Sequence, residues 1–580
     1  MNRVTYSEKI GNLLKQLNVG IVIQVAVTLL VLFMVLYPIG WLWLGSIRVN
    51  PFKPELTLSW YARIFTDAVL WQRVLDTLKI TIGTGIMSLI IGVPMAWIVA
   101  RTDTPLRKRF ELIAVVPFMT APLIGAIAWI NLAAPRTGLI NLLYRYFFDP
   151  SMQSGPLNIY SLEGIIFCLG LYYSPYVFLF TAGALRAMDP SLEEASRISG
   201  CNILQTTFRV TLPLVYPAIT SGMLLSMVFA AGQFAIPALL GTPAQISVMT
   251  TTIYELMNRW PINRSLAAAI GNLLVVFTFV LLYLRGKLLS KGSFTTVTGK
   301  GYRPDVVRLG RWRYVTVAYC LLYTLLAFGL PMFALTYGSL IKYWSTNIGF
   351  HKLGLWNYEY LFTGHSLTYV ALKNSLLLAL LGATICVVIS TIISFIVNRT
   401  KSKWRPLLDY ISMMPIGVPG VVFAVGILLG WIRPPLALYG TFGILLVGYI
   451  SRFNPVGIRA ISSSLVQVHP ELEESSRVCG AGWGGTLARI TLPLVKPGMQ
   501  AAWMTLFIVF IREFGVSLFL YSPGNEVVSI MLYEFWEDGD MMRASALSII
   551  LLVITVIAIV VMRRLTGTDV AGIKTKDIGG

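Results

Sequence analysis

Long apolar runs separated by short polar segments dominate the pattern of this chain. A helix that crosses a membrane needs about 20 mostly apolar residues, and the pattern meets that length repeatedly. It predicts helices near residues 20–45, 77–100, 112–134, 162–187, 217–240 and 266–285, and again near 315–340, 374–398, 409–432, 438–461, 497–520 and 544–562. The expected fold class is therefore all-α, a polytopic membrane protein with about 12 transmembrane helices.

One group of motifs occurs twice in the same order. PSLEEASRISG at 190–200 matches PELEESSRVCG at 470–480, at an offset of 280 residues. VTLPLVYP at 210–217 matches ITLPLVKP at 490–497 at the same offset. The chain is therefore expected to consist of two homologous halves.

A second repeat has a different offset. Ala100-Arg101-Thr102 matches Asn398-Arg399-Thr400 at 298 residues, so the first half holds about 18 additional residues before its PSLEEASRISG motif. The polar stretch 135–161, which is rich in turn-forming residues, is the expected place for them, as an external loop.

The repeat divides the chain into three parts. Residues 1–290 form a first half of six spans, 291–314 a linker, and 315–580 a second half of six spans. Because each half has an even number of spans, both have the same orientation. We expect them to be related by a pseudo-twofold axis along the membrane normal.

Charge then sets the orientation. Only 12% of the residues are charged, against about 25% in soluble domains. The net charge is +20, and the basic residues lie in short runs beside the apolar segments and in the 285–313 region. This pattern favours the positive-inside rule and contact with membrane lipid over binding of nucleic acid. Both termini are expected in the cytoplasm, with the acidic stretch 521–543 outside.

Cysteine and histidine give no sign of a redox or metal centre. The five cysteines are scattered singly with no CxxC pair, and the three histidines are dispersed. We expect no disulfide and no metal site.

The first copy of the repeated motif predicts a short helix between two spans. Asp189 can cap its amino end, and Pro190 suits the first helical position. Glu193 and Glu194 fall in the first turn, where the helix dipole favours anions, and Gly200 can end the helix. In the second copy the matching residues are Pro470, Glu473, Glu474 and Gly480, with His469 as a poorer cap.

An ordinary connector is the simplest explanation of such a segment, but it does not explain the repeat. A free connector should drift between the copies, whereas here the spans have diverged more than the loop. We therefore interpret both segments as docking sites for the same kind of partner.

These segments resemble the EAA loop of binding-protein-dependent ABC importer permeases. That pattern reads Glu-Ala-Ala, three residues, Gly, about nine more residues, then Ile-x-Leu-Pro. The matching residues of the first copy are Glu194, Ala195, Ser196, Gly200, Leu212 and Pro213. Those of the second copy are Glu474, Ser475, Ser476, Gly480, Leu492 and Pro493, where Ser475 replaces the first Ala of the family pattern.

The resemblance implies a pore whose two loops act as coupling helices on two copies of a cytosolic ABC ATPase. It also implies an external substrate-binding protein and a place in the bacterial inner membrane. The chain has no GxxxxGK[ST] motif, so we expect no enzyme activity and no bound cofactor. ATP and Mg would be used by the partner ATPase.

Fusion of both halves in one chain is similar to the permeases for ferric iron. Thiamine, aminoethylphosphonate, sugar phosphate and polyamine permeases are related, and residues 232–243 also resemble polyamine permeases. These assignments of substrate rest on analogy alone.

Polar residues inside the spans are candidates for the translocation path. Arg512 and Glu513 lie within the eleventh predicted span, and Glu513 matches Gln233 at the offset of 280. Ionisable groups at this depth are costly and usually face a cavity or each other. Arg512 and Glu513 could therefore line the path with Gln233, or form a local pair that only stabilises packing.

Two other classes of function remain open from the residues alone. A secondary transporter with internal repeats should show more buried carboxylates at midplane. A membrane enzyme would need a cluster of His, Asp or Ser at one depth. Neither class explains the doubled motif.

Overall fold

The computed structural model describes residues 19–189, 191–290, 306–344, 353–400, 404–433 and 437–566, and its named elements there are all helical. The predicted linker 291–314 is thus described only from residue 306. The first half contains α2 (Val19–Ser46), α3 (Ser59–Thr66), α4 (Ala68–Arg101), α5 (Arg107–Met119), α6 (Pro122–Ala133), α7 (Leu139–Phe147), α8 (Leu162–Ala187), α9 (Ser191–Ile198), α10 (Ile203–Thr206), α11 (Leu212–Ala231), α12 (Met249–Asn258) and α13 (Arg264–Ser290). The second half contains α14 (Arg313–Thr324), α15 (Leu330–Leu340), α16 (Trp356–Glu359), α17 (Ser366–Arg399), α18 (Arg405–Gly417), α19 (Gly420–Trp431), α20 (Phe442–Val466), α21 (Glu471–Val478), α22 (Trp483–Thr486), α23 (Leu492–Ile511), α24 (Ser517–Leu520), α25 (Val528–Glu537) and α26 (Met541–Thr566).

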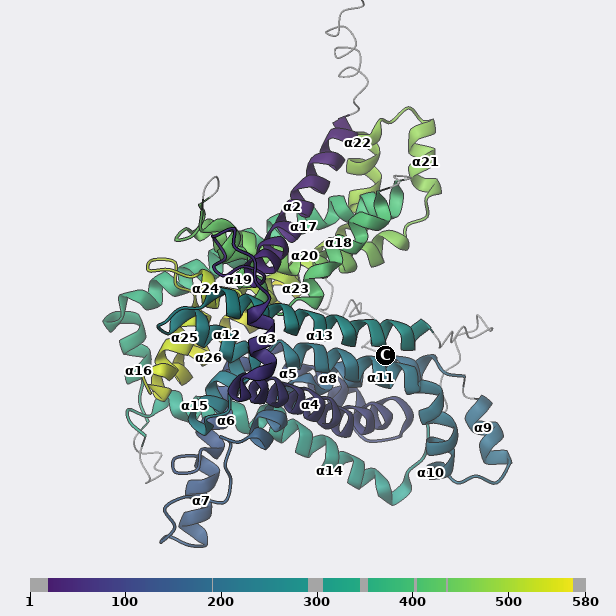
Figure 1. Ribbon diagram of the computed structural model, residues 1–580. Helices are drawn as coiled ribbons and strands as arrows, with labels where there is room; N and C mark the ends of the chain where they lie inside the picture. Colours follow the sequence, from purple (N-terminus) through teal and green to yellow (C-terminus); the bar gives the residue numbers. More distant parts are fainter. Residues whose placement is uncertain are drawn as a thin grey trace, which may run out of the picture.

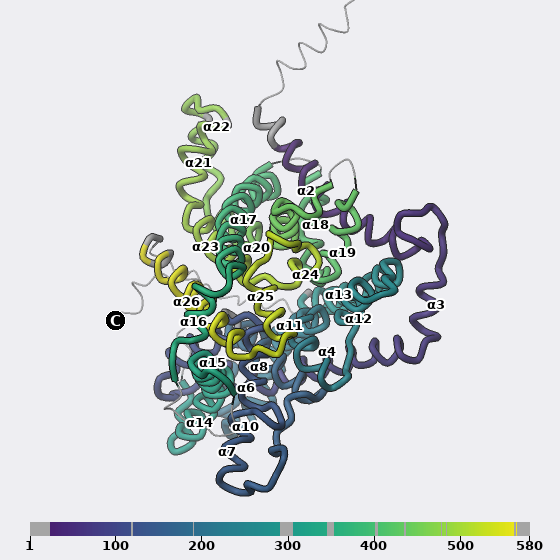
Figure 2. The backbone as a smooth tube through the Cα atoms, turned by 90° about the vertical axis from the view of Figure 1, so that its left-hand side faces the viewer, coloured from purple at the N-terminus to yellow at the C-terminus, as the bar shows by residue number. Residues whose placement is uncertain are grey.

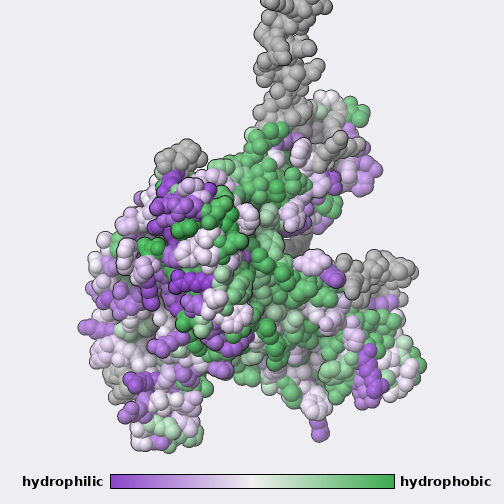
Figure 3. Space-filling view, viewed as in Figure 1, coloured by the Kyte–Doolittle hydropathy of each residue, from purple (hydrophilic) through white to green (hydrophobic). Residues whose placement is uncertain are grey.

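The prediction of about twelve spans is confirmed within the described residues. Ten helices there are long and apolar enough to cross a membrane, and the count reaches twelve if each of two bent helix pairs is one span. Hydrophobic side chains cover the middle of the face shown in Figure 3, over α2 and α13, while hydrophilic ones gather toward the end that carries α12 and α25.

Two predicted spans are not single helices. The span expected at 112–134 is the pair α5 and α6, bent by 99°, and that expected at 409–432 is α18 and α19, bent by 112°. Pro122 begins α6 and Pro419 immediately precedes α19. Proline lacks the backbone N–H that a continuing helix needs, yet it suits the start of a new one. The apolar composition therefore continues through the break while the helical hydrogen bonds do not.

Two further spans end earlier than predicted. The helices expected at 217–240 and 497–520 stop at Ala231 and Ile511, where Gly232 and Arg512 follow. The chain then continues in short turns instead of completing the apolar run. The hydropathy pattern predicted an uninterrupted span in each segment, but a glycine in one and polar residues in both interrupt the helices.

The elements of the two halves recur in the same order. The helices α9 to α11 match α21 to α23 at an offset of 280, and α4 to α6 match α17 to α19 at 298. Between α6 and α8 lie 28 residues, whereas ten lie between α19 and α20, so the 18 additional residues lie where they were predicted. That insertion contains α7, a helix that the turn-rich pattern did not suggest.

The first span of each half packs between the two halves. α2 lies against α13 of its own half and α19 of the other, and α15 lies against α26 and α6 in the equivalent way. The hydroxyl of Tyr37 donates to the carbonyl of Gly430 at 2.8 Å, and that of Tyr323 to the carbonyl of Ala114 at 3.2 Å. Each half is therefore completed by a helix of the other, as the interleaved tube of Figure 2 shows.

The two copies of the motif lie at the same end of the molecule. Figure 1 shows α9 and α10, with α21 and α22, at the right, and α7, α16 and α25 at the left. The long bundles α4–α8–α11 and α17–α20–α23 connect the two ends.

Candidate coupling helices and central cavity

The helix α9 forms as its local sequence predicts. The carboxylate of Asp189 accepts a hydrogen bond from the backbone N–H of Ser191 at 2.9 Å, and this bond lowers the pKa of Asp189. Pro190 lies outside the described residues. Glu193 and Glu194 fall in the first turn, and Arg197 lies in the last one, where each charge complements the helix dipole.

Glu193 attaches α9 to the rest of its half. One of its carboxylate oxygens lies 3.7 Å from a guanidinium nitrogen of Arg101, at the end of α4. The other accepts a hydrogen bond from the hydroxyl of Thr211 at 2.7 Å. All three side chains are buried. A buried carboxylate with these partners positions the short helix against both α4 and α11.

The second copy is attached in the same way. Glu473 of α21 lies 3.3 Å from Nε of Arg399 and accepts a hydrogen bond from Thr491 at 3.1 Å. A second contact is also repeated, because Ser196 bonds Thr206 at 3.0 Å and Ser476 bonds Thr486 at 3.1 Å. The two copies are therefore attached by equivalent pairs of residues, as their similar sequences suggest.

The remaining motif residues of each helix face away from the chain. Glu194 and Ala195 are exposed, and Ile198 is 87% exposed at the end of α9. The second copy leaves Glu474, Ser475 and Val478 exposed, the last by 88%. The motif thus combines a buried face that holds the helix and an outer face that is free to meet a partner.

Gly200 and Gly480 end these helices in the left-handed conformation, with φ of +87° and +84°. The N–H of Cys201 bonds the carbonyl of Ser196, and that of Gly200 bonds the carbonyl of Arg197, which is a Schellman cap. A Cβ at either glycine would meet no atom of this chain within 4 Å. Conformation alone, not space within the chain, explains glycine here.

The Leu-Pro part of each motif starts the following span. Leu212 and Pro213 begin α11, and Leu492 and Pro493 begin α23. A π-helical turn precedes each, in which the N–H of Leu212 reaches the carbonyl of Thr207. The proline cannot donate to the turn before it, and the wider turn accommodates its ring.

Two residues of this site were missed by reasoning from the motif. Arg101 and Arg399 belong to the repeat at an offset of 298, to which the sequence analysis assigned no function. That repeat could have identified them, because an arginine present in both copies at the end of a span needs a partner for its charge. The described part of the linker lies beside Arg101, because the N–H of Val307 donates to the carbonyl of Arg101 at 2.9 Å.

A cavity of about 320 Å³ lies between the halves at the broken helices. Gln233, Arg512 and Glu513 all line it, as does Arg452 of α20, which the sequence did not single out. In the part of the chain that the structure describes, no three His, Cys, Asp or Glu side chains lie close enough to hold a metal ion.

Polar contacts hold the groups of this cavity. Gln233 donates from Nε2 to the hydroxyl of Tyr173 at 3.1 Å, and Glu513 accepts from the backbone N–H of Val516 at 2.9 Å. Arg452 donates to the carbonyl of Pro415 at 2.6 Å. Arg512 and Arg452 both lie within electrostatic range of Glu513. Glu513 thus belongs to a group of charges around the cavity and not only to a pair with its neighbour.

A cluster of aromatic rings lies between the cavity lining and the helices α12 and α25. Phe234 and Phe514, which are equivalent at the offset of 280, have ring centroids 5.7 Å apart. Tyr254 of α12 and Tyr533 of α25, which are equivalent at an offset of 279, lie 6.0 Å apart and contact Phe234. We call Phe234, Tyr254, Phe514 and Tyr533 the aromatic layer. Equivalent residues from the two halves therefore meet each other there.

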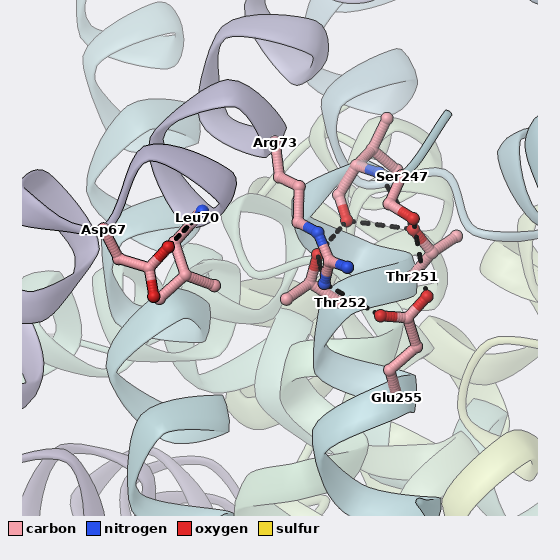
Figure 4. A network of polar contacts seen from close by, with 8 residues as sticks. Asp67, Leu70, Arg73, Ser247, Thr251, Thr252 and Glu255 are labelled. Carbon is pink, nitrogen blue, oxygen red and sulfur yellow. Dashed lines mark hydrogen bonds and ion pairs between the residues drawn. The ribbon is translucent and has the colours of Figure 1, made fainter. Parts of the chain in front are cut away.

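Beyond the layer, the two halves differ in charge. In the first half, Arg73 of α4 lies 2.8 Å from Glu255 of α12 and also donates to Thr252 at 3.2 Å, as Figure 4 shows. In the second half, Ala371 and Glu534 hold the positions of Arg73 and Glu255. Burial raises the pKa of Glu534, and the nearby carboxylates of Glu526, Asp538 and Glu537 raise it further. Among the residues that the structure describes, only the first half pairs this half-buried carboxylate with an arginine.

Comparison with known proteins agrees with this architecture. The pattern of the family described as binding-protein-dependent transport system inner membrane component matches residues 88–291 and again 386–567. The two matches contain the two copies of the coupling motif and most of both bundles.

Individual relatives cover most of the chain. A protein named putative ferric transport system permease protein FbpB 1, from Haemophilus influenzae, is 26% identical over 87% of this chain and 78% of its own. The ferric transport system permease protein FbpB of Actinobacillus pleuropneumoniae is 25% identical over 91% of this chain and 76% of its own. The spermidine/putrescine transport system permease protein PotB of Haemophilus influenzae is 29% identical over 42% of this chain and 84% of its own. With the family pattern present twice, this chain is a fused permease of the binding-protein-dependent ABC importers.

Proposed function

We propose that this chain forms the whole translocation path of an importer for ferric iron, driven by two copies of a separate ATPase. The observation that carries the proposal is the duplicated attachment of α9 and α21, through Glu193–Arg101 and Glu473–Arg399. Two helices that are attached in equivalent ways at one end of the molecule suit two identical partner proteins.

Force on these helices has a direct route to the cavity. A push on α9 reaches α4 through Arg101 and α11 through Thr211. The far end of α11 is Gly232–Gln233, at the cavity wall. Closure of the ATPase pair would therefore move the helix ends that line the cavity, and open the path toward the aromatic layer.

Ferric iron is the proposed substrate because three relatives that each match more than 80% of the chain are named ferric or Fe(3+) transport permeases, whereas the polyamine relative covers less than half. An external binding protein would deliver the substrate at the end with α12 and α25. The end of the molecule that carries α9 and α21 would then face the cytoplasm, as the basic residues predict.

The test is reconstitution of the chain in liposomes with the ATPase and binding protein encoded beside it. Uptake of radioactive ferric iron should require ATP and all three proteins, and putrescine should not compete. Gradient-driven uptake by the chain alone would contradict the coupling, and uptake of putrescine in place of iron would contradict the substrate.

A further inference from the structure

The charged side chains that line the central cavity all come from one half. They are Arg452, Arg512 and Glu513, and the equivalent positions of the first half hold Tyr172, Gly232 and Gln233, which are uncharged. The first half supplies aromatic and hydroxyl groups to the cavity instead, from Tyr173, Tyr176 and Phe229. The cavity is therefore asymmetric in charge although the fold is repeated.

The charges that line this cavity do not sum to zero. Glu513 can neutralise one guanidinium group, so the two arginines and one glutamate leave one positive charge among the lining residues. Two helices, α6 and α19, begin at the cavity, and three, α11, α18 and α23, end there. Their dipoles together offset about half an elementary charge, so the sum stays positive.

The arginines are held in place. Arg452 donates to the carbonyl of Pro415, and Arg512 lies within electrostatic range of Glu513 and of the hydroxyls of Tyr173 and Tyr176. Gly420 lies between the opposite charges, because a Cβ there would be 3.7 Å from Nε of Arg452 and 3.8 Å from a carboxylate oxygen of Glu513. Arg452 is thus fixed by the carbonyl of Pro415, and both positive groups are guanidinium groups, which suit carboxylate or phosphate oxygens.

We propose that the cavity receives its cargo in anionic form, so that iron enters as a ferric ion that carries carboxylate or phosphate ligands and not as a bare cation. This inference rests on the proposed function, because it requires the cavity to lie on the transport path. A bare cation or a polyamine would meet like charge from Arg452 and Arg512, and such repulsion is stronger in a protein interior than in bulk water. The acidic residues of α25, Glu534 and Glu537, are not among the residues that line the cavity.

The binding test uses the purified full chain in detergent. Its unfolding temperature is measured against increasing citrate, ferric citrate and putrescine. We expect saturable stabilisation by ferric citrate, and half-saturation at about tenfold higher concentration in Arg512→Gln and Arg452→Gln, since each removes a charged hydrogen-bond donor. Arg452→Lys keeps the charge and should stay near the unmodified chain.

Two controls separate the charge of the cavity from charge in general. Arg405→Gln removes an exposed arginine at the start of α18 and should leave binding unchanged. Glu513→Gln raises the positive charge of the cavity and should preserve or tighten binding. Stabilisation by citrate alone would identify a free anion as sufficient, whereas stabilisation by ferric citrate only would identify the complex.

Tighter binding of putrescine than of either anion, no saturable anion binding, or equal binding in the arginine variants would overturn the proposal. The same variants are then tested for ATP-dependent uptake with the partner proteins. If uptake of iron occurs but ignores Arg452 and Arg512, the anionic cargo is wrong and the importer stands. If no uptake occurs although binding discriminates, the proposed function fails instead.

Discussion

At the scale of residues, adjacent glutamates of one motif have different environments. Glu193 is buried between Arg101 and Thr211, whereas Glu194 is exposed. The spacing of the motif placed both in the first turn without distinguishing them, because only the packing of α9 on α4 decides which one faces inward.

We predict that Glu193→Gln uncouples transport from ATP hydrolysis. Glu194→Gln should leave the folded chain intact. The first variant leaves the buried guanidinium of Arg101 without its carboxylate, which costs about 3 kcal/mol. The measurement is the amount of substrate transported per ATP hydrolysed, with protein abundance as the control for folding. Equal effects of the two variants on thermal stability would show that the buried pair has no special role.

A second prediction at this scale concerns the outer carboxylates. The pKa of Glu534 is raised above the usual glutamate value of 4.5, so the folded chain holds this proton more tightly than the unfolded chain. The resulting stability is fully present below pH 4.5 and is lost as the pH rises through the raised pKa. Glu534→Gln should therefore raise the unfolding temperature at neutral pH and reduce its dependence on pH.

The equivalent residue Glu255 provides the matched control, because it pairs with Arg73 at 2.8 Å. Glu255→Gln should lower the unfolding temperature at neutral pH by an amount corresponding to about 1 kcal/mol. Shifts of the same sign in both variants would contradict the difference between the halves.

At the scale of elements, helix ends decide where this protein can bend and dock. α9 and α21 each end at a glycine with positive φ, and the pairs α5–α6 and α18–α19 break at prolines beside the cavity. The same two residue types that interrupt helices therefore occur both at the candidate coupling helices and at the cavity.

We predict that the pair of substitutions Gly200→Asn and Gly480→Asn leaves the fold intact but weakens coupling. Asparagine tolerates the left-handed conformation, so its cost to the helix is small, and a side chain there meets no atom of this chain within 4 Å. Any larger loss of binding to the ATPase must come from steric crowding of the docked partner. The measurement is copurification with the ATPase together with the unfolding temperature.

Gly200→Ala with Gly480→Ala separates the two causes, since alanine adds less bulk but costs about 1 kcal/mol in this conformation. If the asparagine double variant copurifies normally with the ATPase and the alanine double variant does not, the glycines serve only the backbone conformation of this chain.

At the scale of the whole molecule, the two halves enclose one cavity and meet in one aromatic layer. α2 and α15 each lie between the halves, and Phe234 contacts Phe514 across them. Movement of one half against the other must therefore separate the aromatic rings.

We predict that Phe234→Ala with Phe514→Ala makes the path leaky. Both rings are buried, with 2% and 7% of their surface exposed. Their removal opens the cavity toward the α12 and α25 end, so liposomes that contain the variant should release a small trapped solute without ATP.

Phe333→Ala is the control, because Phe333 lies on an exposed face of α15 with 51% of its surface accessible. Its effect on leakage should be negligible. The double variant loses large core side chains, at about 3 kcal/mol or more each, so folding is checked by its unfolding temperature. Tight liposomes with correctly folded double variant would exclude the layer as the closure.

The sequence by itself determined the all-α class, the number of spans, the repeated order and the position of the 18 additional residues. It could do so because length and hydropathy of a span follow from the bilayer, and because a repeat is visible as a constant offset. Residues Gly200 and Gly480 were also placed correctly as helix ends, since the left-handed conformation there favours glycine.

Only the tertiary structure decided how these elements meet. The breaks at Pro122 and Pro419, the burial of Glu193 against Arg101, and the entry of Arg452 into the cavity depend on helices far apart in the sequence. A hydropathy pattern reports how apolar each segment is, and not which neighbour it contacts. The cavity charge arises because three side chains from two different spans of one half converge on the same space, and no local pattern contains that contact.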